Sequence, residues 1–260
     1  MMYIRYFVGP MSKNVVDAVM EFMATTGNNI GFIPSRRQIE HDGGYANNWT
    51  TMQLRKHVGE ETFIVRDHAG PGQGRTGDNG YDSLEQDCKY LNMIHIDPWK
   101  KYSKYEDGLR TTVDMINFCY NKNSEIEYEV GTEEAIRRFT FSEIDQFLCD
   151  LKHILLPPVY TQIKYCVIQS GTSLKANENN GTYDEQRLCS MIKVVKKHAL
   201  LSKEHNGDYL PPRLIQEKFL LGLDSINIAP EFGQIETKTY VETIKRTSPD
   251  LLNTLWQICY

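Results

Sequence analysis

Short apolar runs recur along almost the whole of this 260-residue chain, and each ends in a polar cluster that is followed by a helix-like stretch. Apolar runs of this length with turn-forming residues behind them are typical of strands buried on both faces of a parallel sheet. Eight such strands alternating with helices predict an α/β fold, the (β/α)8 or TIM barrel, as a single domain over residues 1–260. The expected strands are IRYFVGP (from Ile4), NIGFIPSRR (from Asn29), TFIVRDHAGP (from Thr62), NMIHIDP (from Asn92), EIEYEVGTE (from Glu125), IKYCVIQSG (from Ile163), ALLSKEHNGDY (from Ala199) and SINIAPEFG (from Ser225).

Charge and composition limit the classes of partner. The formal net charge is -5 and no basic stripe offsets it, so we expect no binding to nucleic acid. No apolar run is long enough to span a bilayer, and we expect a cytoplasmic protein without membrane contact that forms a homo-oligomer. The six cysteines include no CxxC pair and mostly fall at apolar positions, which predicts reduced core thiols.

The segments between the strands predict helices and one long loop. In the first segment, Ser12 is a predicted cap, and Val15, Val16 and Val19 share one helical face behind it. The glycine-rich segment 70–83 matches neither element, and we expect a mobile lid rather than a phosphate clamp because no lysine follows in the P-loop pattern. Amphipathic spacing predicts helices near residues 12–26, 105–120, 141–155, 183–198, 211–222 and 236–246.

Ionisable side chains gather at the predicted strand ends, where a barrel of this kind carries its chemistry because the βα loops converge on one mouth. Three of the seven histidines, His68, His95 and His205, stand there and are predicted metal ligands. A lone histidine at such a place is more often structural, but three beside several carboxylates favour a functional site. The predicted catalytic residues are Asp67, Asp97, Glu129 and Glu133, and the predicted substrate-binding residues are Arg36, Arg75, Gln169, Lys203, Asp208 and Glu231.

This set of side chains suits proton transfer beside a carbonyl group that is polarised by a metal ion. Asp67 is the expected proton carrier, and His68 and His205 are the expected neutral ligands. Glu129 or Glu133 is expected as an oxygen ligand or as a partner of a ligand. The expected cofactor is a divalent metal ion, zinc before others.

A phosphate group on the substrate is a second expectation. In TIM barrels, phosphate commonly lies at the loops after the seventh and eighth strands, and both loops here hold a glycine that lets the backbone approach an anion. We therefore expect backbone amides of segments 206–209 and 231–234 to bind phosphate, together with Arg36, Arg75 or Lys203.

Several of these strand-end motifs resemble one known family, the non-catalytic (accessory) subunit of class II D-tagatose-1,6-bisphosphate aldolases. IPSRRQIEHDGGYANNWT resembles a stretch of that family that leads to a GGY motif, and RDHAGPGQG resembles its GDHLGP segment. IHID, EVGTE and KEHNGDYLPP resemble its IHLD, IGTE and EAHSTDYQ segments. The order agrees along roughly the whole chain, which implies a class II aldolase-like TIM barrel related to proteins that act on ketose phosphates.

The resemblance also implies roles for individual residues. The wider class II aldolase superfamily holds zinc with histidines, and an Asp-His pair at one strand end supplies the proton-transfer acid and one ligand. Asp67 and His68 fit that pair, and His205 fits a later zinc histidine. Where catalytic members carry another histidine on the sixth strand, this chain has Gln169, so a three-histidine site would need His95 or a carboxylate instead.

Three functions are compatible with these observations. The first is a class II, metal-assisted aldolase or isomerase that acts on a sugar phosphate or a related phosphorylated carbohydrate. The second is an accessory subunit that stabilises a separate, catalytic ketose-bisphosphate aldolase. The third is a sugar or nucleotide-sugar binding protein in which the loop 70–83 closes over the ligand.

Overall fold

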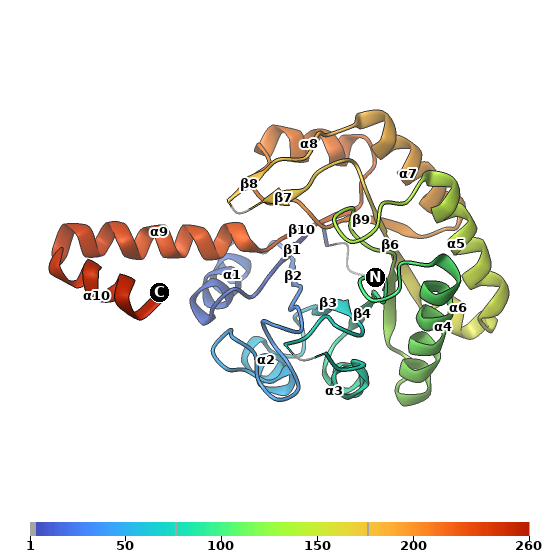
Figure 1. Cartoon of the computed structure of the whole chain (residues 1–260), viewed down its shortest axis with the longest axis horizontal. Coiled ribbons are helices and arrows are strands. Elements are labelled where there is room, and N and C mark those ends of the chain that lie inside the picture. Colours follow the sequence, from blue (N-terminus) through green and yellow to red (C-terminus); the bar gives the residue numbers. More distant parts are fainter. Residues whose placement is uncertain (1–3, 76, 176, 260) are drawn as a thin grey trace.

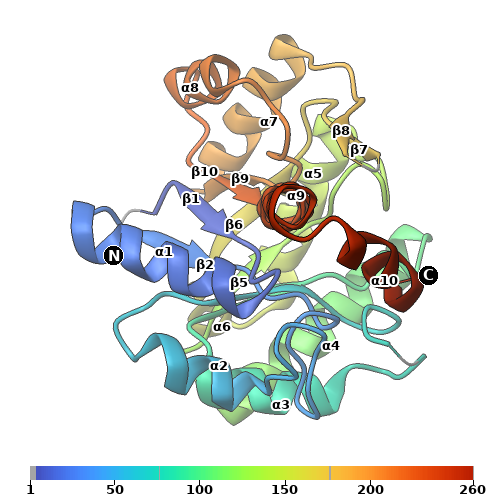
Figure 2. The same cartoon turned by 90° about the vertical axis from the view of Figure 1, so that its left-hand side faces the viewer.

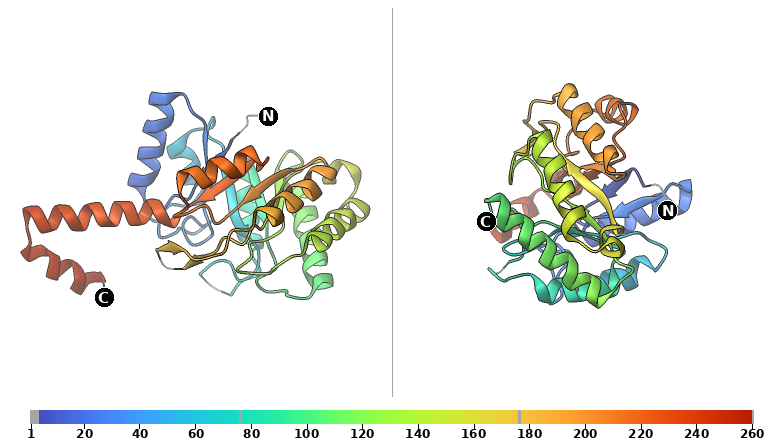
Figure 3. Two further views of the ribbon diagram at one scale, coloured as in Figure 1. Left: turned by 90° about the horizontal axis from the view of Figure 1, so that it is seen from above. Right: turned by 90° about the vertical axis from the view of Figure 1, so that its right-hand side faces the viewer.

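The computed structural model describes residues 4–75, 77–175 and 177–259, in which strands alternate with helices (Figure 1). The helices lie around the outside of the strands, as views from other directions also show (Figures 2 and 3). The elements in chain order are β1 (Tyr6–Val8), α1 (Lys13–Thr26), β2 (Ile30–Phe32), α2 (Thr51–Val58), β3 (Val65–Ala69), α3 (Tyr81–Tyr90), β4 (Met93–Ile96), α4 (Tyr105–Lys122), β5 (Glu127–Val130), α5 (Phe141–Ile154), α6 (Pro157–Tyr160), β6 (Ile163–Ile168), β7 (Leu174–Lys175), β8 (Glu178–Asn179), α7 (Glu185–Lys197), β9 (Leu201–Glu204), α8 (Pro212–Leu220), β10 (Ser225–Ile228), α9 (Pro230–Thr247) and α10 (Asp250–Cys259).

Eight parallel strands form the barrel that the sequence predicts. Their order is β2-β1-β10-β9-β6-β5-β4-β3, and each neighbouring pair runs parallel. Between β2 and β3, at the two ends of this order, the described residues make the isolated parallel bridges Phe32↔Ile64 and Ser35↔Asp67 in place of a continuous ladder. The barrel is therefore nearly closed, and the predicted (β/α)8 fold is confirmed.

The structure also contains elements that the apolar pattern does not reveal. Helices α2 and α3 follow the second and third barrel strands, and β7 and β8 form a small antiparallel hairpin before α7. The buried faces of α2 and α3 carry Thr51, Arg55, Ser83 and Asp87, so the periodicity of apolar residues there is weak. The helix expected near 236–246 is the carboxyl-terminal part of the longer α9.

Helix α1 shows how an amphipathic segment becomes part of the core. The Ser12 hydroxyl accepts a hydrogen bond from the backbone N–H of Val15 at 3.1 Å and caps the helix, and Gly27 ends it in the left-handed region at φ 69°. The buried side chains of Val15, Val16 and Val19 pack in one apolar cluster against the barrel. Burial of one such side chain contributes about 1.5–3 kcal/mol.

The prediction of core thiols is confirmed for three cysteines and is wrong for one. Cys88, Cys119 and Cys166 are buried, as core thiols would be, but Cys149 is exposed because it lies on the outer surface of α5. Among the described residues, no helix combines the length and the apolar character needed to cross a membrane.

Helices α9 and α10 form an arm that projects away from the barrel (Figures 1 and 3). None of the 18 residues of α9 is buried, and the arm exposes Ile235, Tyr240 and Trp256. An apolar groove of about 640 Å³ lies between α1 and the base of α9. This groove is lined by residues of the two helices, together with Val8 of β1 and Ile30 of β2.

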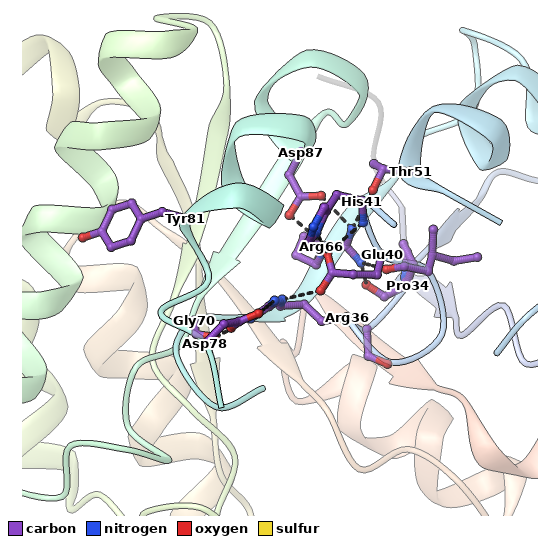
Figure 4. Close-up of polar contacts among 12 residues, drawn as sticks. Pro34, Arg36, Glu40, His41, Thr51, Arg66, Gly70, Asp78, Tyr81 and Asp87 are labelled. Carbon is purple, nitrogen blue, oxygen red and sulfur yellow. Dashed lines mark hydrogen bonds and ion pairs between the residues drawn. The ribbon is translucent and has the colours of Figure 1, made fainter. Parts of the chain in front are cut away.

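A buried guanidinium group joins the two barrel strands that lack a ladder. Arg66 on β3 is fully buried and donates two hydrogen bonds to the Asp87 carboxylate, at 2.6 and 2.8 Å (Figure 4). It also donates to the carbonyl oxygens of Pro34 and Ile39, at 3.0 and 2.7 Å, and to the Thr51 hydroxyl at 3.1 Å. Arg66 thereby ties the segment after β2 to both β3 and α3.

We expect Arg66→Leu to lower the free energy of unfolding by about 3–5 kcal/mol, because it leaves the Asp87 carboxylate buried without its charged partner. The matched control is Arg110→Leu, since Arg110 pairs with Asp107 on the surface at 2.8 Å and should change stability by less than about 1 kcal/mol. Denaturant unfolding of both variants measures the difference. Equal losses would contradict the role assigned to Arg66.

Candidate functional site

The three predicted ligand histidines meet at the carboxyl ends of the barrel strands. The ring centroids of His68, His95 and His205 lie 4.8–5.0 Å from one another. Together with Asp67, each offers a ligand atom within 4.8 Å of the others. The structure therefore brings residues from β3, β4 and the end of β9 into one cluster.

An irregularity in β3 turns two consecutive side chains toward this cluster. A regular strand would send Asp67 and His68 to opposite faces of the sheet. The β3–β4 register shifts between Arg66 and Ala69, and His68 has a φ of 46°, in the left-handed region. Such a conformation costs on the order of 1–3 kcal/mol for a residue other than glycine and is common beside functional sites.

His95 supports this irregularity and has both ring nitrogens engaged. Its Nδ1 accepts a hydrogen bond from the backbone N–H of His68 at 3.2 Å, and its Nε2 lies 3.0 Å from the carbonyl oxygen of Gly131. Nε2 must therefore carry the proton, and the ring is neutral. Burial agrees with this assignment, because it lowers the pKa of His95 to about 4. His95 is better described as a residue that positions His68 than as a free ligand.

A buried carboxylate orients His68. The Nδ1 of His68 lies 2.6 Å from an oxygen of Asp97, which also accepts a hydrogen bond from the Thr132 hydroxyl at 3.0 Å. Burial would raise the pKa of Asp97, but the hydrogen bond and the charge of His68 outweigh burial and lower it. With Nδ1 used in this way, Nε2 of His68 faces the centre of the cluster.

A second buried carboxylate orients His205. The Nε2 of His205 lies 2.6 Å from one oxygen of Glu129, and the ammonium group of Lys203 donates to the other oxygen at 2.8 Å. Lys203 is itself fully buried, 3.8 Å above the ring of Phe7. Burial would raise the pKa of Glu129, but Lys203 and His205 lower it, so the carboxylate stays charged. Nδ1 of His205 then faces the cluster.

Three ligand atoms face one another at the centre of the cluster. Nε2 of His68 and Nδ1 of His205 lie 3.4 Å apart, and Oδ1 of Asp67 lies 3.8 and 3.5 Å from them. Oδ1 of Asp67 is buried and has no hydrogen-bond partner among the described residues. Ligands of a tetrahedral zinc ion at about 2.0–2.1 Å lie roughly 3.3–3.4 Å from one another, so this donor set fits such an ion.

The remaining predicted residues lie elsewhere, and Arg36 is one of the most deeply buried. It is 1% exposed and donates to Glu40 at 2.7 Å, to the Asp78 carboxylate at 2.7 and 2.8 Å, and to the carbonyl oxygen of Gly70 at 3.0 Å (Figure 4). A Cβ at Gly70, where φ is 152°, would lie 2.6 Å from the carbonyl oxygen of Asp97. Arg36 thus anchors the start of the glycine-rich loop, and the guanidinium group that was expected to bind substrate is instead paired within the protein.

Gln169 is also engaged with the protein itself. Its side-chain nitrogen donates to the carbonyl oxygens of Thr132 and Arg137, at 2.8 Å each. Its side-chain oxygen accepts from the backbone N–H of Phe139 at 2.9 Å. Gln169 fixes the loop after β5, and the structure does not bring it into the histidine cluster.

The other predicted residues divide between the loops of the mouth. Arg75 is exposed in the glycine-rich loop, and Glu133 is partly exposed just after β5. The Asp208 carboxylate accepts hydrogen bonds from backbone amides at the start of α9, and Glu231 accepts one from the backbone N–H of Tyr209 at 2.7 Å. Asp208 and Glu231 therefore join two neighbouring loops.

Gln73, Gly131 and Thr132 are site residues that the sequence pattern does not single out. The Gln73 side chain lies within 3.5 Å of the Asp97 carboxylate, while Thr132 and Gly131 bind Asp97 and His95. Each stands in a strand-end motif, GPGQG or EVGTE, but the motifs do not show which member faces the histidines.

Comparison with known proteins shows a shared fold. No family model matches the sequence, and no curated protein matches it. Solved structures do match. A probable tagatose 6 phosphate kinase from Sinorhizobium meliloti has a TM-score of 0.73 at 15% identity, and the match covers 88% of this chain and 65% of that protein.

Two aldolases are similar over more of their length. The fructose-bisphosphate aldolase of Campylobacter jejuni has a TM-score of 0.68 at 14% identity, with 96% of this chain and 77% of that protein covered. The YdjI aldolase of Escherichia coli has a TM-score of 0.65 at 13% identity, with coverages of 96% and 85%. At these identities the likeness shows the architecture alone.

We expect protonated His68 to stabilise the metal-free protein in a pH-dependent way. Burial alone would lower the pKa of His68, but the carboxylates of Asp67 and Asp97 raise it to about 10. The unfolded value is about 6.5, so the contribution is fully present below about pH 6.5 and is lost as the pH rises through about 10. After chelation, wild type should exceed His68→Gln in unfolding free energy by more at about pH 6 than at about pH 10. The exposed His153→Gln should show no such change, and a constant difference for His68→Gln would contradict the assignment.

Proposed function

We propose that the chain is a metal-dependent enzyme of the aldolase or isomerase type that acts next to the carbonyl group of a sugar or sugar-phosphate substrate. The observation that carries this proposal is the set of three convergent ligand atoms, from Asp67, His68 and His205, at the mouth of the barrel, of which Oδ1 of Asp67 is buried without a hydrogen-bond partner among the described residues. The likeness to aldolases supports it through the fold. Nitrogen and carboxylate donors at this spacing favour zinc.

The residues around this set have separable roles. Asp97 and Glu129 orient the two ligand histidines so that Nε2 of His68 and Nδ1 of His205 face inward, where each would bind a metal ion in its deprotonated form. When bound, a divalent cation at this place polarises a carbonyl oxygen and stabilises the negative charge that develops as a neighbouring C–H or C–C bond breaks.

We assign proton transfer to a carboxylate that does not orient either ligand histidine. Oδ1 of Asp67, the proton carrier expected from the sequence, lies 3.8 Å from Nε2 of His68 and 3.5 Å from Nδ1 of His205, so we assign Asp67 to the ligand set. Glu133 is partly exposed just after β5, and its negative charge contributes to the raised pKa of His68. We assign the movement of the substrate proton to Glu133.

The amount of bound metal distinguishes the ligand residues from the proposed proton carrier. We expect His68→Ala and His205→Ala to lose most of the bound metal, and Asp97→Asn to weaken metal affinity by about 10–100-fold, because Asp97 orients a ligand. Glu133→Gln should keep the wild-type metal content and lose turnover. Elemental analysis after dialysis against zinc measures this, with the exposed His153→Ala as control. Equal metal in wild type and His68→Ala would remove the zinc assignment.

A panel of candidate substrates tests the activity. Metal-loaded protein is incubated in D₂O with ketoses and ketose phosphates, and proton NMR follows both exchange of the C–H beside the carbonyl and cleavage into two carbonyl fragments. We expect at least one compound to react, and chelated protein to be inactive. A metal-loaded protein that catalyses neither reaction would favour the accessory-subunit or sugar-binding function.

A further inference from the structure

The loops after β9 and β10 form one corner of the barrel mouth. β9 and β10 are adjacent in the sheet, and the 18-residue helix α9 begins at Pro230 with its amino terminus in this corner. In barrels of this fold, backbone amides at this place commonly hold a phosphate group, since the amino terminus of a helix favours negative charge. The chemistry of this corner therefore decides which end of a substrate it accepts.

Here four backbone amides of the corner are already paired with groups of the chain itself. The Asp208 carboxylate accepts hydrogen bonds from the backbone N–H groups of Ala229, at 2.9 Å, and Glu231, at 2.8 Å. The N–H of Tyr209 donates to the Glu231 carboxylate at 2.7 Å, and that of Gly207 donates to a backbone carbonyl at 3.0 Å. Asp208 is 2% exposed, so its charge lies inside the corner.

Asp208 also takes the place of a missing cap. The residue at the N-cap of α9 is Ala229, which has no side chain able to accept a hydrogen bond from the first turn. A carboxylate from the preceding βα loop accepts those hydrogen bonds instead and faces the positive end of the helix. The position that would attract a phosphate is thus filled by an anion of the protein.

We propose that Asp208 is a built-in anion that makes this barrel select a substrate with an uncharged hydroxyl group, not a phosphate, at this end. The inference rests on the proposed function and narrows its substrate class. A phosphate dianion would have to displace a buried carboxylate and approach both Asp208 and Glu231, which repel it. A hydroxyl group can instead donate a hydrogen bond to an acceptor in the corner.

A second acceptor lies on β10, the strand that leads into the corner. Asn227 is 4% exposed, and its Oδ1 is buried without a hydrogen-bond partner among the described residues. Asn227 is level with Phe7 in the β1–β10 register, and Phe7 packs with Val65 and Tyr165 in a buried cluster. An unpaired buried acceptor is costly, and a hydroxyl of the substrate would satisfy it, whereas a phosphate dianion has no proton to donate.

The test uses inorganic phosphate and chelated, full-length protein, so that neither metal nor turnover is involved. Amide NMR spectra are recorded during the titration. In wild type we expect the signals of Gly207, Tyr209, Ala229 and Glu231 not to move. In Asp208→Ala the same signals should shift and saturate, with a phosphate affinity at least tenfold above wild type, because two amides lose their acceptor.

Two further variants make the outcome decisive. Asp82→Ala removes an exposed acid from the first turn of α3 and should gain no phosphate binding. Asp208→Asn keeps the size of the side chain and one oxygen acceptor, so it tests the charge if Asp208→Ala fails to fold. Phosphate shifts at the corner in wild type would overturn the proposal, and so would the absence of any gain in the folded Asp208 variants. The metal-content experiment fails or succeeds independently.

Discussion

The buried guanidinium group of Arg66 is the interaction on which the rest of the site depends. β2 and β3 meet through two isolated bridges, and Arg66 spans that joint from the outer face of β3. Its charge is balanced by Asp87 on α3, so one side chain connects two strands and a helix. Asp67 and His68 follow it immediately in the chain, and their place at the mouth therefore depends on this joint.

Paired charges then set the orientation of each histidine. Asp97 holds one nitrogen of His68, and Glu129 holds one nitrogen of His205. Lys203 keeps Glu129 charged inside the barrel, where an unpaired carboxylate would be strongly disfavoured. Each buried charge is compensated by a partner in a fixed position, and this mutual dependence holds the cluster in one geometry.

The two proposals assign different ligand preferences to two parts of the barrel mouth. The cluster of Asp67, His68 and His205 collects ligand atoms and carboxylates that a cation would neutralise. The corner beside α9 instead supplies its own anion, Asp208, to amides that would otherwise attract one. A substrate with a carbonyl group at one end and a hydroxyl group at the other meets both requirements.

The sequence alone determines the alternation of strands and helices, because burial on both faces imposes continuous apolar runs. It also determines that Asp67, His68, His95 and His205 stand at strand ends, since those positions follow from the end of each apolar run. Only the tertiary structure decides what each of them does. The irregularity in β3 and the engagement of His95 depend on hydrogen bonds between different strands, which no local pattern encodes.

Contacts between distant segments also decide the roles of Arg36, Lys203 and Asp208. The sequence predicts Arg36 and Lys203 as phosphate ligands, because it shows two cations near strand ends but does not show which carboxylates pair with them. In the fold, Arg36 meets Asp78 from a loop 42 residues away, and Lys203 meets Glu129 from a strand 74 residues away. Asp208 likewise becomes a cap only because α9 begins beside it. The sequence gives the chemical type of each side chain. Which side chains remain available to bind a ligand is decided by contacts between distant segments.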